Sequence, residues 1–213
     1  MKKVLVLVFV VAVVLVIAYL HLHNFTDNTK TDLSSIKKAD ETPLGITNVD
    51  KEGLAPGRFI DAFVTKVVDG DTIDVTYKGE KHRVRLLDMD TPESVKQGVT
   101  VQPYAKEASN FTRNMALGQS VRLVFESKLE DPYGRLLAHV ILKDGTYLNA
   151  LLVRNGFARA EVLAPNLAYK DYFYGLQEKA INDKAGLWGL SKDKQPFIKG
   201  ENGLYIPRYL ENQ

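Results

Sequence analysis

Hydrophobic residues are distributed unevenly along the chain. Lys2 and Lys3 precede an unbroken apolar run from Val4 to Leu20. A charged start followed by such a run is typical of a targeting or anchoring segment, so residues 1–20 are set apart from the fold. At about 1.5 Å per residue the run spans roughly 26 Å as a helix, a little less than the ~30 Å hydrocarbon core of a membrane. The pattern therefore leaves two interpretations open, an uncleaved signal-anchor and a signal peptide cleaved near Val16–Ala18.

Residues 21–57 have a different composition, rich in Asn, Asp, Thr, Lys and Ser and without a sustained apolar period. Such a segment cannot bury enough apolar surface to order itself, so we predict a flexible polar linker. His21 and His23 could together ligate a metal, but a solvated linker is the simpler interpretation.

From residue 58 onward the pattern is that of short strands and helices. Runs rich in β-branched and aromatic residues, separated by turn residues, predict five strands at residues 59–68, 72–77, 82–87, 121–125 and 135–142. Three helices are predicted at residues 104–117, 148–155 and 167–184. Pro103 suits the first position of the first helix, and Gly118 and Gly156 suit the ends of the first two.

Five strands with a helix between the third and fourth are the signature of an OB-type barrel. The predicted fold class is thus mixed β/α: a five-stranded OB-fold β-barrel with three helices, preceded by the hydrophobic leader and the polar linker. We place this single domain at residues 58–190 and a C-terminal tail at residues 191–213.

Composition narrows the possible chemistry. The chain of 213 residues has no cysteine, which excludes a disulfide scaffold, a thiolate zinc site and a cysteine nucleophile. Four histidines leave little for a histidine-rich metal site or a Ser-His-Asp triad. The net charge of +2 is too small to indicate nucleic-acid binding by itself, so any such binding must come from a local patch.

Carboxylates gather where the predicted strands end. Asp69 and Asp71 follow the first strand, and Asp88, Asp90 and Glu93 follow the third. Because these strands are neighbours in the barrel, we expect both groups to face one pocket. Carboxylates so close together repel unless a cation or arginines lie among them, and ligands that are all oxygen favour calcium or magnesium. Taken singly, each aspartate could instead be an ordinary turn residue. An EF-hand loop is excluded, because the sixth position counted from Asp69 lacks the required glycine.

Arg85 and Arg135 complete a plausible site for phosphodiester chemistry. In-line attack on a phosphodiester builds negative charge on the phosphoryl oxygens, which planar guanidinium groups match in a bidentate manner. Glu93 could orient or deprotonate the attacking water. For an isolated arginine, a surface salt bridge is the simpler interpretation.

Taken together, these residues lie in an ordered set of motifs that resembles the staphylococcal nuclease (thermonuclease) family over roughly 130 residues. The matching segments are Val67–Thr72, Arg85–Glu93, Tyr104–Ser109, Asp131–Arg135, Leu152–Gly156 and Gly186–Trp188. The resemblance implies an OB-fold endonuclease, a hydrolase that uses Ca²⁺ to cleave DNA and RNA and leaves 3′-phosphates.

The resemblance also implies a role for each matching residue. Asp71 and Asp90 correspond to side-chain metal ligands, and Thr91 to a carbonyl ligand. Asp69 corresponds to an acid behind these ligands. Three residues correspond to the catalytic set and one to a substrate contact: the general base Glu93, the phosphate-binding arginines Arg85 and Arg135, and the substrate-contacting Tyr133.

Two segments depart from the family pattern. Pro132 replaces a lysine, which removes one phosphate contact. Residues 159–165 form a shorter segment without the tyrosines that help to hold the terminal nucleotide. Both departures bear on substrate affinity and base preference.

Two other interpretations are retained at this point. OB barrels also bind single strands without cutting them, which makes a non-catalytic nucleic-acid-binding module the principal alternative. A membrane-tethered adaptor with a vestigial nuclease fold would leave the acidic cluster unexplained. We expect an extracytoplasmic monomer, membrane-anchored through residues 4–20 or secreted, with single-stranded or frayed DNA and RNA as partners.

Overall fold

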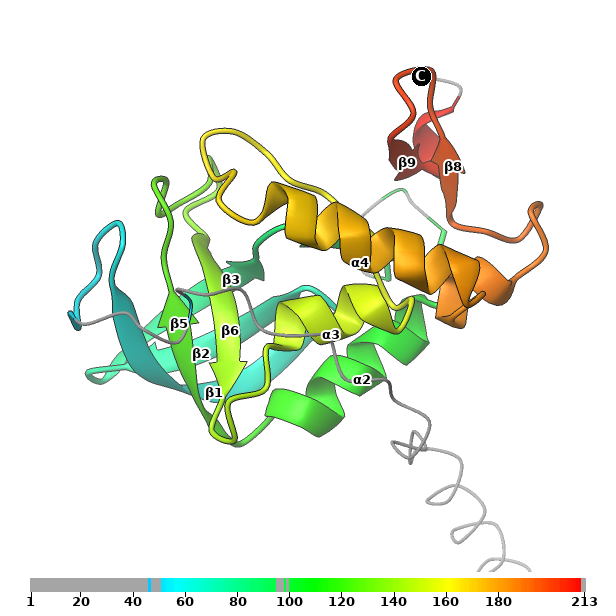
Figure 1. The fold of residues 1–213 in the computed structure, drawn as a ribbon. Coiled ribbons are helices and arrows are strands. Elements are labelled where there is room, and N and C mark those ends of the chain that lie inside the picture. The colour runs from blue at the N-terminus through cyan, green and yellow to red at the C-terminus, as the bar shows by residue number, and fades with distance from the viewer. Residues whose placement is uncertain (1–45, 47–50, 95–97, 99, 212–213) are drawn as a thin grey trace, which may run out of the picture. The chain divides into compact units, whose positions relative to one another are not determined.

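The computed structural model describes residue 46, residues 51–94, residue 98 and residues 100–211, all within one unit that spans residues 36–213 (Figure 1). The predicted leader and most of the predicted linker lie outside the described residues. Within the described part of the chain, no helix has both the length and the apolar character that crossing a membrane requires.

Five strands close into a barrel in the order β1-β2-β3-β6-β5. These are β1 (Phe59–Asp69), β2 (Thr72–Tyr77), β3 (Glu80–Leu86), β5 (Ser120–Val124) and β6 (Leu136–Leu142). All neighbours are antiparallel except β3 and β6, which run parallel. Alternation of apolar and polar residues drives this arrangement, because every second side chain of a strand faces the barrel interior. The predicted OB-type barrel is confirmed.

Three helices lie together on one side of the barrel (Figure 1). They are α2 (Ala105–Ala116), α3 (Leu148–Arg154) and α4 (Lys170–Asn182). The expectation for Pro103 was wrong, because Tyr104 adopts a left-handed backbone conformation with φ 71° and the helix begins after it. Gly118 ends the same helix in a left-handed conformation, as predicted, with φ 73°.

The apolar core fills the barrel and continues between the barrel and the helices. Its largest fully buried members include Ile60, Phe111, Leu123, Leu136 and Phe173.

Asn149 is fully buried and ties α3 to β6 and to the residue that follows β3. Its Nδ2 donates to the carbonyl of Leu87 at 2.9 Å, and its Oδ1 accepts from the backbone N–H of Val140 at 2.9 Å. The amide therefore fixes the chain just where it leaves β3, next to the predicted site.

Short elements that the sequence did not predict surround the barrel. Strands β4 (Met89–Asp90) and β7 (Arg159–Ala160) pair with each other, and β8 (Phe197–Lys199) and β9 (Tyr205–Pro207) form a hairpin. Two 3₁₀ turns, η2 (Gly186–Gly189) and η3 (Arg208–Leu210), flank this hairpin. The hairpin packs on the domain through Tyr205, whose ring lies edge-on to Trp188 with centroids 4.7 Å apart.

The predicted domain limits stay a prediction. Ile46, within the predicted linker, is fully buried, and the hairpin falls within residues 191–213.

Candidate functional site

The turn between β1 and β2 packs closely against α2 and against the segment that follows β4. A Cβ added to Gly70 would lie 2.7 Å from Cγ2 of Thr91 and 2.9 Å from Cβ of Ala108, so a glycine is needed for this approach. Thr112 on α2 donates to the carbonyl of Gly70 at 2.6 Å. The packing therefore fixes the two aspartates that flank Gly70.

Asp71 is buried and held by hydrogen bonds from two threonines. Thr91 donates to its Oδ2 from the backbone N–H at 3.1 Å and from the hydroxyl at 2.9 Å, and Thr72 donates to its Oδ1 at 2.8 Å. Arg85 on β3 forms an ion pair with the same carboxylate. Burial raises the pKa of Asp71, but Arg85 and the Thr91 hydrogen bonds outweigh it and hold the pKa below its ordinary value.

Asp90 on β4 belongs to the same charged group as Asp71 and Arg85, and it forms ion pairs with two arginines. Arg85 Nη2 lies 2.9 Å from its Oδ1, and Nε of Arg159 on β7 lies 3.0 Å from its Oδ2. Glu161 forms an ion pair with Arg159 and lies 3.6 Å from Arg85. Burial raises the pKa of Asp90 to about 6; Glu161 and Asp71 add to the increase, while the two arginines oppose it.

The donor set of this group suits a hard cation. The side-chain ligand atoms of Asp71 and Asp90 are all oxygens, and both carboxylates converge on the one guanidinium of Arg85. Three carboxylates share two guanidinium groups here, so the group carries a net negative charge when fully ionised. Oxygen ligands of this kind suit calcium or magnesium better than a metal that prefers sulfur or imidazole.

Two of the other predicted site residues lie on the α2 side of this group. Asp69 accepts hydrogen bonds from the hydroxyls of Ser94 at 2.7 Å and Ser109 at 2.8 Å. The backbone N–H of Glu93 donates to Oε1 of Gln102 at 2.7 Å, which fixes the chain after Thr91. Asp69 thus anchors the segment that carries Glu93.

Arg135 and Tyr133 lie on the loop that joins β5 to β6, on a turn built around Asp131. The carboxylate of Asp131 accepts from the backbone N–H groups of Tyr133 at 2.8 Å and Arg135 at 3.0 Å, and from Nε of Arg135 at 2.5 Å. The Tyr133 side chain is 85% exposed, with the Arg135 guanidinium 5.7 Å from its ring centroid. The turn therefore presents an aromatic ring and a cation together to solvent.

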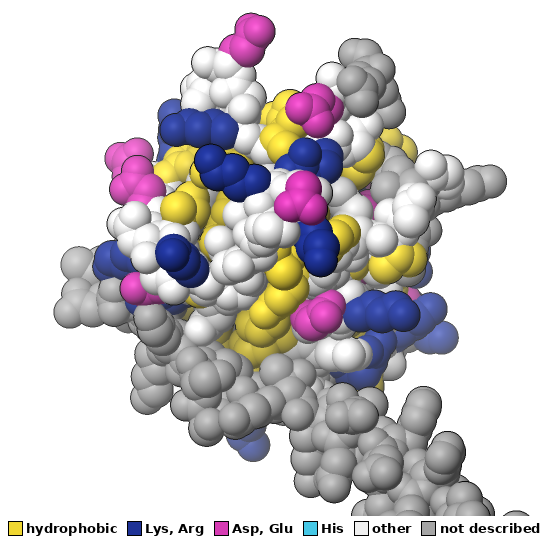
Figure 2. Space-filling view, turned by 90° about the vertical axis from the view of Figure 1, so that its right-hand side faces the viewer, with side chains coloured by type: hydrophobic (Ala, Val, Ile, Leu, Met, Phe, Trp, Pro, Cys, Tyr) yellow, Lys and Arg dark blue, Asp and Glu magenta, His cyan; other side chains and the backbone are white. Residues whose placement is uncertain are grey.

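A cavity of about 770 Å³ extends from this loop over the barrel surface, and several of its lining residues are basic. Lys66, Lys81 and Arg83 line it together with Tyr133 and Arg135. On the face shown in Figure 2, by contrast, basic and acidic side chains are interspersed without a broad area of one sign. Among the described residues, the cavity is therefore a local basic patch. Because the net charge of the chain is low, nucleic-acid binding was expected to depend on such a patch.

Asp88 departs from the expected arrangement, in which both acidic groups face one pocket. Its backbone φ of 64° is left-handed, and its carboxylate lies close to Glu126 and His139. Burial, reinforced by the Glu126 carboxylate, raises the pKa of Asp88 to about 8. The expectation for Asp88 was wrong because simple strand alternation does not hold across a left-handed residue.

Arg159 and Glu161 are members of the charged group that the sequence did not identify. Arg159 is 7% exposed and also donates to the carbonyl of Tyr205 in the hairpin at 2.7 Å. Opposite charges two residues apart, just after the Gly156 turn, were the available signal. That signal could not predict the ion pair between Arg159 and Asp90, because Asp90 lies 69 residues away along the chain.

Comparison of the sequence with known proteins identifies the family of this chain. Residues 83–190, which include Arg85, Asp90 and Arg135, match the family model described as staphylococcal nuclease homologue. Thermonuclease of Staphylococcus intermedius is 42% identical over 125 residues, which cover 59% of this chain and 74% of that protein. The chain belongs to the staphylococcal nuclease family. The resemblance inferred from the sequence motifs is thereby confirmed.

Other relatives in this nuclease family come from Bacillus subtilis (strain 168). Endonuclease YncB is 37% identical over 148 residues, covering 68% of this chain and 69% of the relative. SPbeta prophage-derived endonuclease YokF is 33% identical over 193 residues, covering 82% of this chain and 64% of the relative.

Proposed function

We propose that this protein is a calcium-dependent nuclease that acts outside the cytoplasm and hydrolyses phosphodiester bonds of DNA and RNA, leaving 3′-phosphates. Membership of the staphylococcal nuclease family supports the reaction class, phosphodiester hydrolysis, and relatives carry the names thermonuclease and endonuclease. The observation that carries the proposal is the convergence of Asp71 and Asp90 on Arg85, with Thr91 hydrogen-bonded to Asp71.

The cation is held by Asp71 and Asp90 through their carboxylates and by Thr91 through its carbonyl. Two hydrogen bonds from Thr91 to the Asp71 carboxylate support this assignment, because they hold the two residues next to each other. When bound, calcium acts as a Lewis acid that polarises a phosphoryl oxygen. Two carboxylates and a carbonyl form an open, flexible set that suits calcium better than the strict octahedron of magnesium.

Glu93 is the general base. It accepts a proton from a water molecule, whose oxygen forms the new bond to phosphorus while the bond from phosphorus to the 5′ oxygen breaks. The departing 5′ oxygen takes a proton from solvent, and the phosphate stays on the 3′ side. The hydrogen bond from the Glu93 backbone to Gln102 supports this role, because it restrains the segment on which the carboxylate is carried.

The two arginines balance the negative charge that develops on the phosphate. Asp131 engages Nε of Arg135, which leaves the two Nη groups of that guanidinium for phosphoryl oxygens. Arg85, which pairs with Asp71 and Asp90, would be the second guanidinium to bind the phosphate. Tyr133 offers an exposed ring on which a base of a single or frayed strand can stack.

Location and assembly belong to the same proposal. The apolar run from Val4 to Leu20, preceded by two lysines, supports export of everything that follows it. The protein then acts as a monomer, anchored through residues 4–20 or released after cleavage. Immunoblotting of membrane and medium fractions for the mature N-terminus distinguishes the anchored form from the secreted one.

One experiment tests the reaction and the cation together. The full chain is incubated with single-stranded DNA in calcium, in magnesium and in chelator, and product ends are mapped. We expect cleavage to 3′-phosphate ends in calcium, none in chelator, and no recovery by calcium in Asp71→Ala. Equal rates in magnesium would contradict the choice of cation. Binding of DNA without cleavage in calcium would favour the alternative, a non-catalytic single-strand-binding module.

A further inference from the structure

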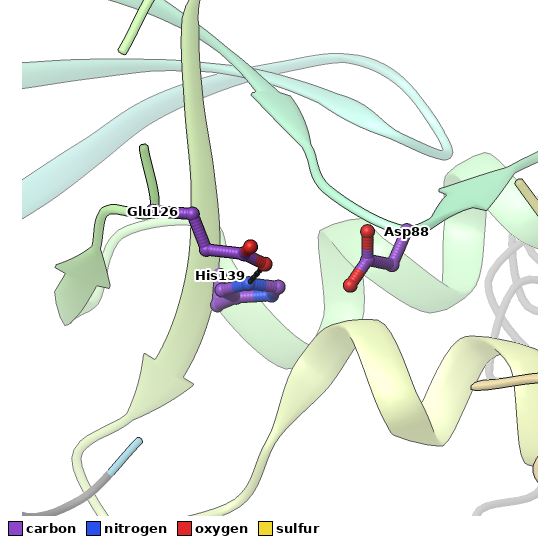
Figure 3. Close-up of side chains that lie close together, drawn as sticks. All are labelled: Asp88, Glu126 and His139. Carbon is purple, nitrogen blue, oxygen red and sulfur yellow. Dashed lines mark hydrogen bonds and ion pairs between the residues drawn. The ribbon is translucent and has the colours of Figure 1, made fainter. Parts of the chain in front are cut away.

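A second cluster of ligand-type side chains lies apart from the proposed calcium site. Asp88 comes from the turn after β3, Glu126 follows β5, and His139 lies on β6 (Figure 3). One ligand atom from each residue lies within 4.8 Å of the other two. The fold therefore brings together three residues from separate parts of the chain. In the described part of the protein, none of the three forms an ion pair with Asp71 or Asp90.

Two members of the cluster already hold each other. His139 Nε2 lies 2.7 Å from Oε1 of Glu126, and His139 Nδ1 lies 2.6 Å from the hydroxyl of Tyr147. The His139 ring is fully buried. Its tilt and position are thus fixed from both edges, and Nδ1 has an oxygen partner of its own. A metal-bound histidine typically has such a partner, because the second nitrogen must carry the proton while the first binds the ion.

Asp88 is the observation that this pair does not explain. Its side chain is 3% exposed, and neither of its carboxylate oxygens has a hydrogen-bond partner among the described residues. A buried polar group without a partner is costly, and such groups are rare in folded proteins. Figure 3 shows the carboxylate aimed across a gap at Glu126 and His139. Two carboxyl groups and an imidazole meet here, and all three are groups that can bind a metal ion.

We propose that Asp88, Glu126 and His139 bind a zinc ion, at a site separate from the calcium site of the nuclease reaction. One imidazole nitrogen with two carboxylate oxygens is a donor set that zinc accepts, whereas calcium prefers oxygen alone. The three ligand atoms lie within 4.8 Å of one another, so side-chain shifts can bring them to the roughly 2.1 Å bonds of one zinc ion. Three protein ligands leave the fourth tetrahedral position to a water molecule.

The ion would fasten three parts of the barrel to one another. It would tie the turn after β3 to β6 and to the segment that follows β5. Asp90 comes two residues after Asp88, so the same fastening would steady a ligand of the proposed calcium site. The ion would not meet a substrate, because neither Asp88 nor His139 is exposed.

Zinc titration of the full chain tests this site directly. The metal-free protein, in detergent, is titrated calorimetrically with Zn²⁺ alone, in a background with His21→Ala and His23→Ala so that the paired histidines near the N-terminus do not compete. We expect one saturable site and a rise in melting temperature on zinc addition. Asp88→Asn and His139→Gln should each weaken zinc binding at least about 10²-fold, because even the loss of an outer-shell partner costs about 10- to 100-fold.

Matched variants make the outcome decisive. Asp88→Asn is the conservative test, because within the described part of the chain the Asp88 carboxylate makes no hydrogen bond that the change would remove. Asp71→Asn removes a proposed calcium ligand and should leave zinc affinity unchanged, which separates failure of this site from failure of the proposed nuclease. Zinc affinity in Asp88→Asn equal to that of the parent protein would overturn the proposal. So would the absence of saturable zinc binding in the parent.

Discussion

Arg85 shows how a single residue sets the charge balance of the candidate site. Its guanidinium forms ion pairs with Asp71 and Asp90, and these acids hold its pKa above the usual value although burial works in the opposite direction. Removing one partner from such a buried pair typically costs about 3–5 kcal/mol, because the remaining charge has no compensation. Predictions at this scale therefore use nearly isosteric changes.

Replacing Glu93 by Gln tests the proposed general base. Glutamine keeps the shape of the side chain but cannot accept a proton, so the cleavage rate should fall by at least about 10²-fold while the protein stays folded. Single-turnover cleavage of a DNA oligonucleotide measures the change. Glu107→Gln, a matched change at an exposed position on α2, should leave the rate unaltered. Wild-type turnover in folded Glu93→Gln would remove Glu93 from the mechanism.

Asp131 gives a prediction about pH. Burial raises the pKa of Asp131, but hydrogen bonds from Arg135 and from the backbone of Tyr133 outweigh it and hold the pKa below its ordinary value. A carboxylate whose pKa is lowered by folding stabilises the native state above its unfolded pKa, about 3.9, and loses that contribution as pH falls through the lower folded value. Asp131→Asn should therefore be less stable than wild type at pH 7, with the difference vanishing towards pH 2 to 3. Urea unfolding across this range provides the measurement, and a difference independent of pH would contradict the assignment.

Elements in this fold depend on close backbone contacts at their ends. The end of α3 meets the start of η2, where the backbone N–H of Leu187 donates to the carbonyl of Gly156 at 2.8 Å. Gly156 has φ 68°, and a Cβ placed there would lie 2.0 Å from the carbonyl oxygen of Ala185. A side chain at this position is thus opposed both by backbone conformation and by lack of space.

Gly156→Ala should destabilise the protein more than a glycine replacement elsewhere. Gly145 is the matched control, because its φ is 85° and nothing lies within 4 Å of an added Cβ. We expect Gly145→Ala to lower the free energy of unfolding by about 1–2 kcal/mol from backbone conformation alone. Gly156→Ala should cost roughly 1–3 kcal/mol beyond that through overpacking. Denaturant unfolding of both variants measures the difference, and equal costs would mean that the α3–η2 contact tolerates a side chain.

At the scale of the whole molecule, electrostatic attraction of a nucleic acid must come from a local group of basic residues. The chain has a net charge of only +2, whereas Lys66, Lys81 and Arg83 line one cavity together with Tyr133 and Arg135. Arg83 is partly neutralised by Asp74, with Nε at 2.7 Å from Oδ1. The two lysines are therefore the clearest candidates for contacts with the phosphates of a bound strand.

Lys66→Ala and Lys81→Ala should each weaken binding of single-stranded DNA at low salt. The slope of log affinity against log salt should become shallower by about 0.7 for each phosphate that the variant no longer neutralises. Turnover at saturating substrate should stay unchanged, since neither lysine belongs to the catalytic group. Lys143→Ala, an exposed change outside this cavity, is the control. A salt slope identical to wild type in both variants would place the substrate path elsewhere.

Local pattern was sufficient to determine the barrel strands, the three helices and most of the charged group. Strand alternation and turn residues act over a few neighbours, so they can be read directly from residues 58–190. Asp71, Arg85 and Asp90 could be brought together in advance because all three lie near the ends of adjacent strands. Their roles with metal and substrate stay predictions.

Tertiary structure alone decided the features that depend on distant segments or on a single unusual residue. Asp88, in a left-handed conformation, lies close to His139, and chain folding brought Arg159 to Asp90 across 69 residues. The hairpin of β8 and β9 formed because Trp188 and Arg159 provide a surface for it, although the segment itself has little apolar pattern. Such contacts are set by packing between elements, which no periodicity within one element encodes.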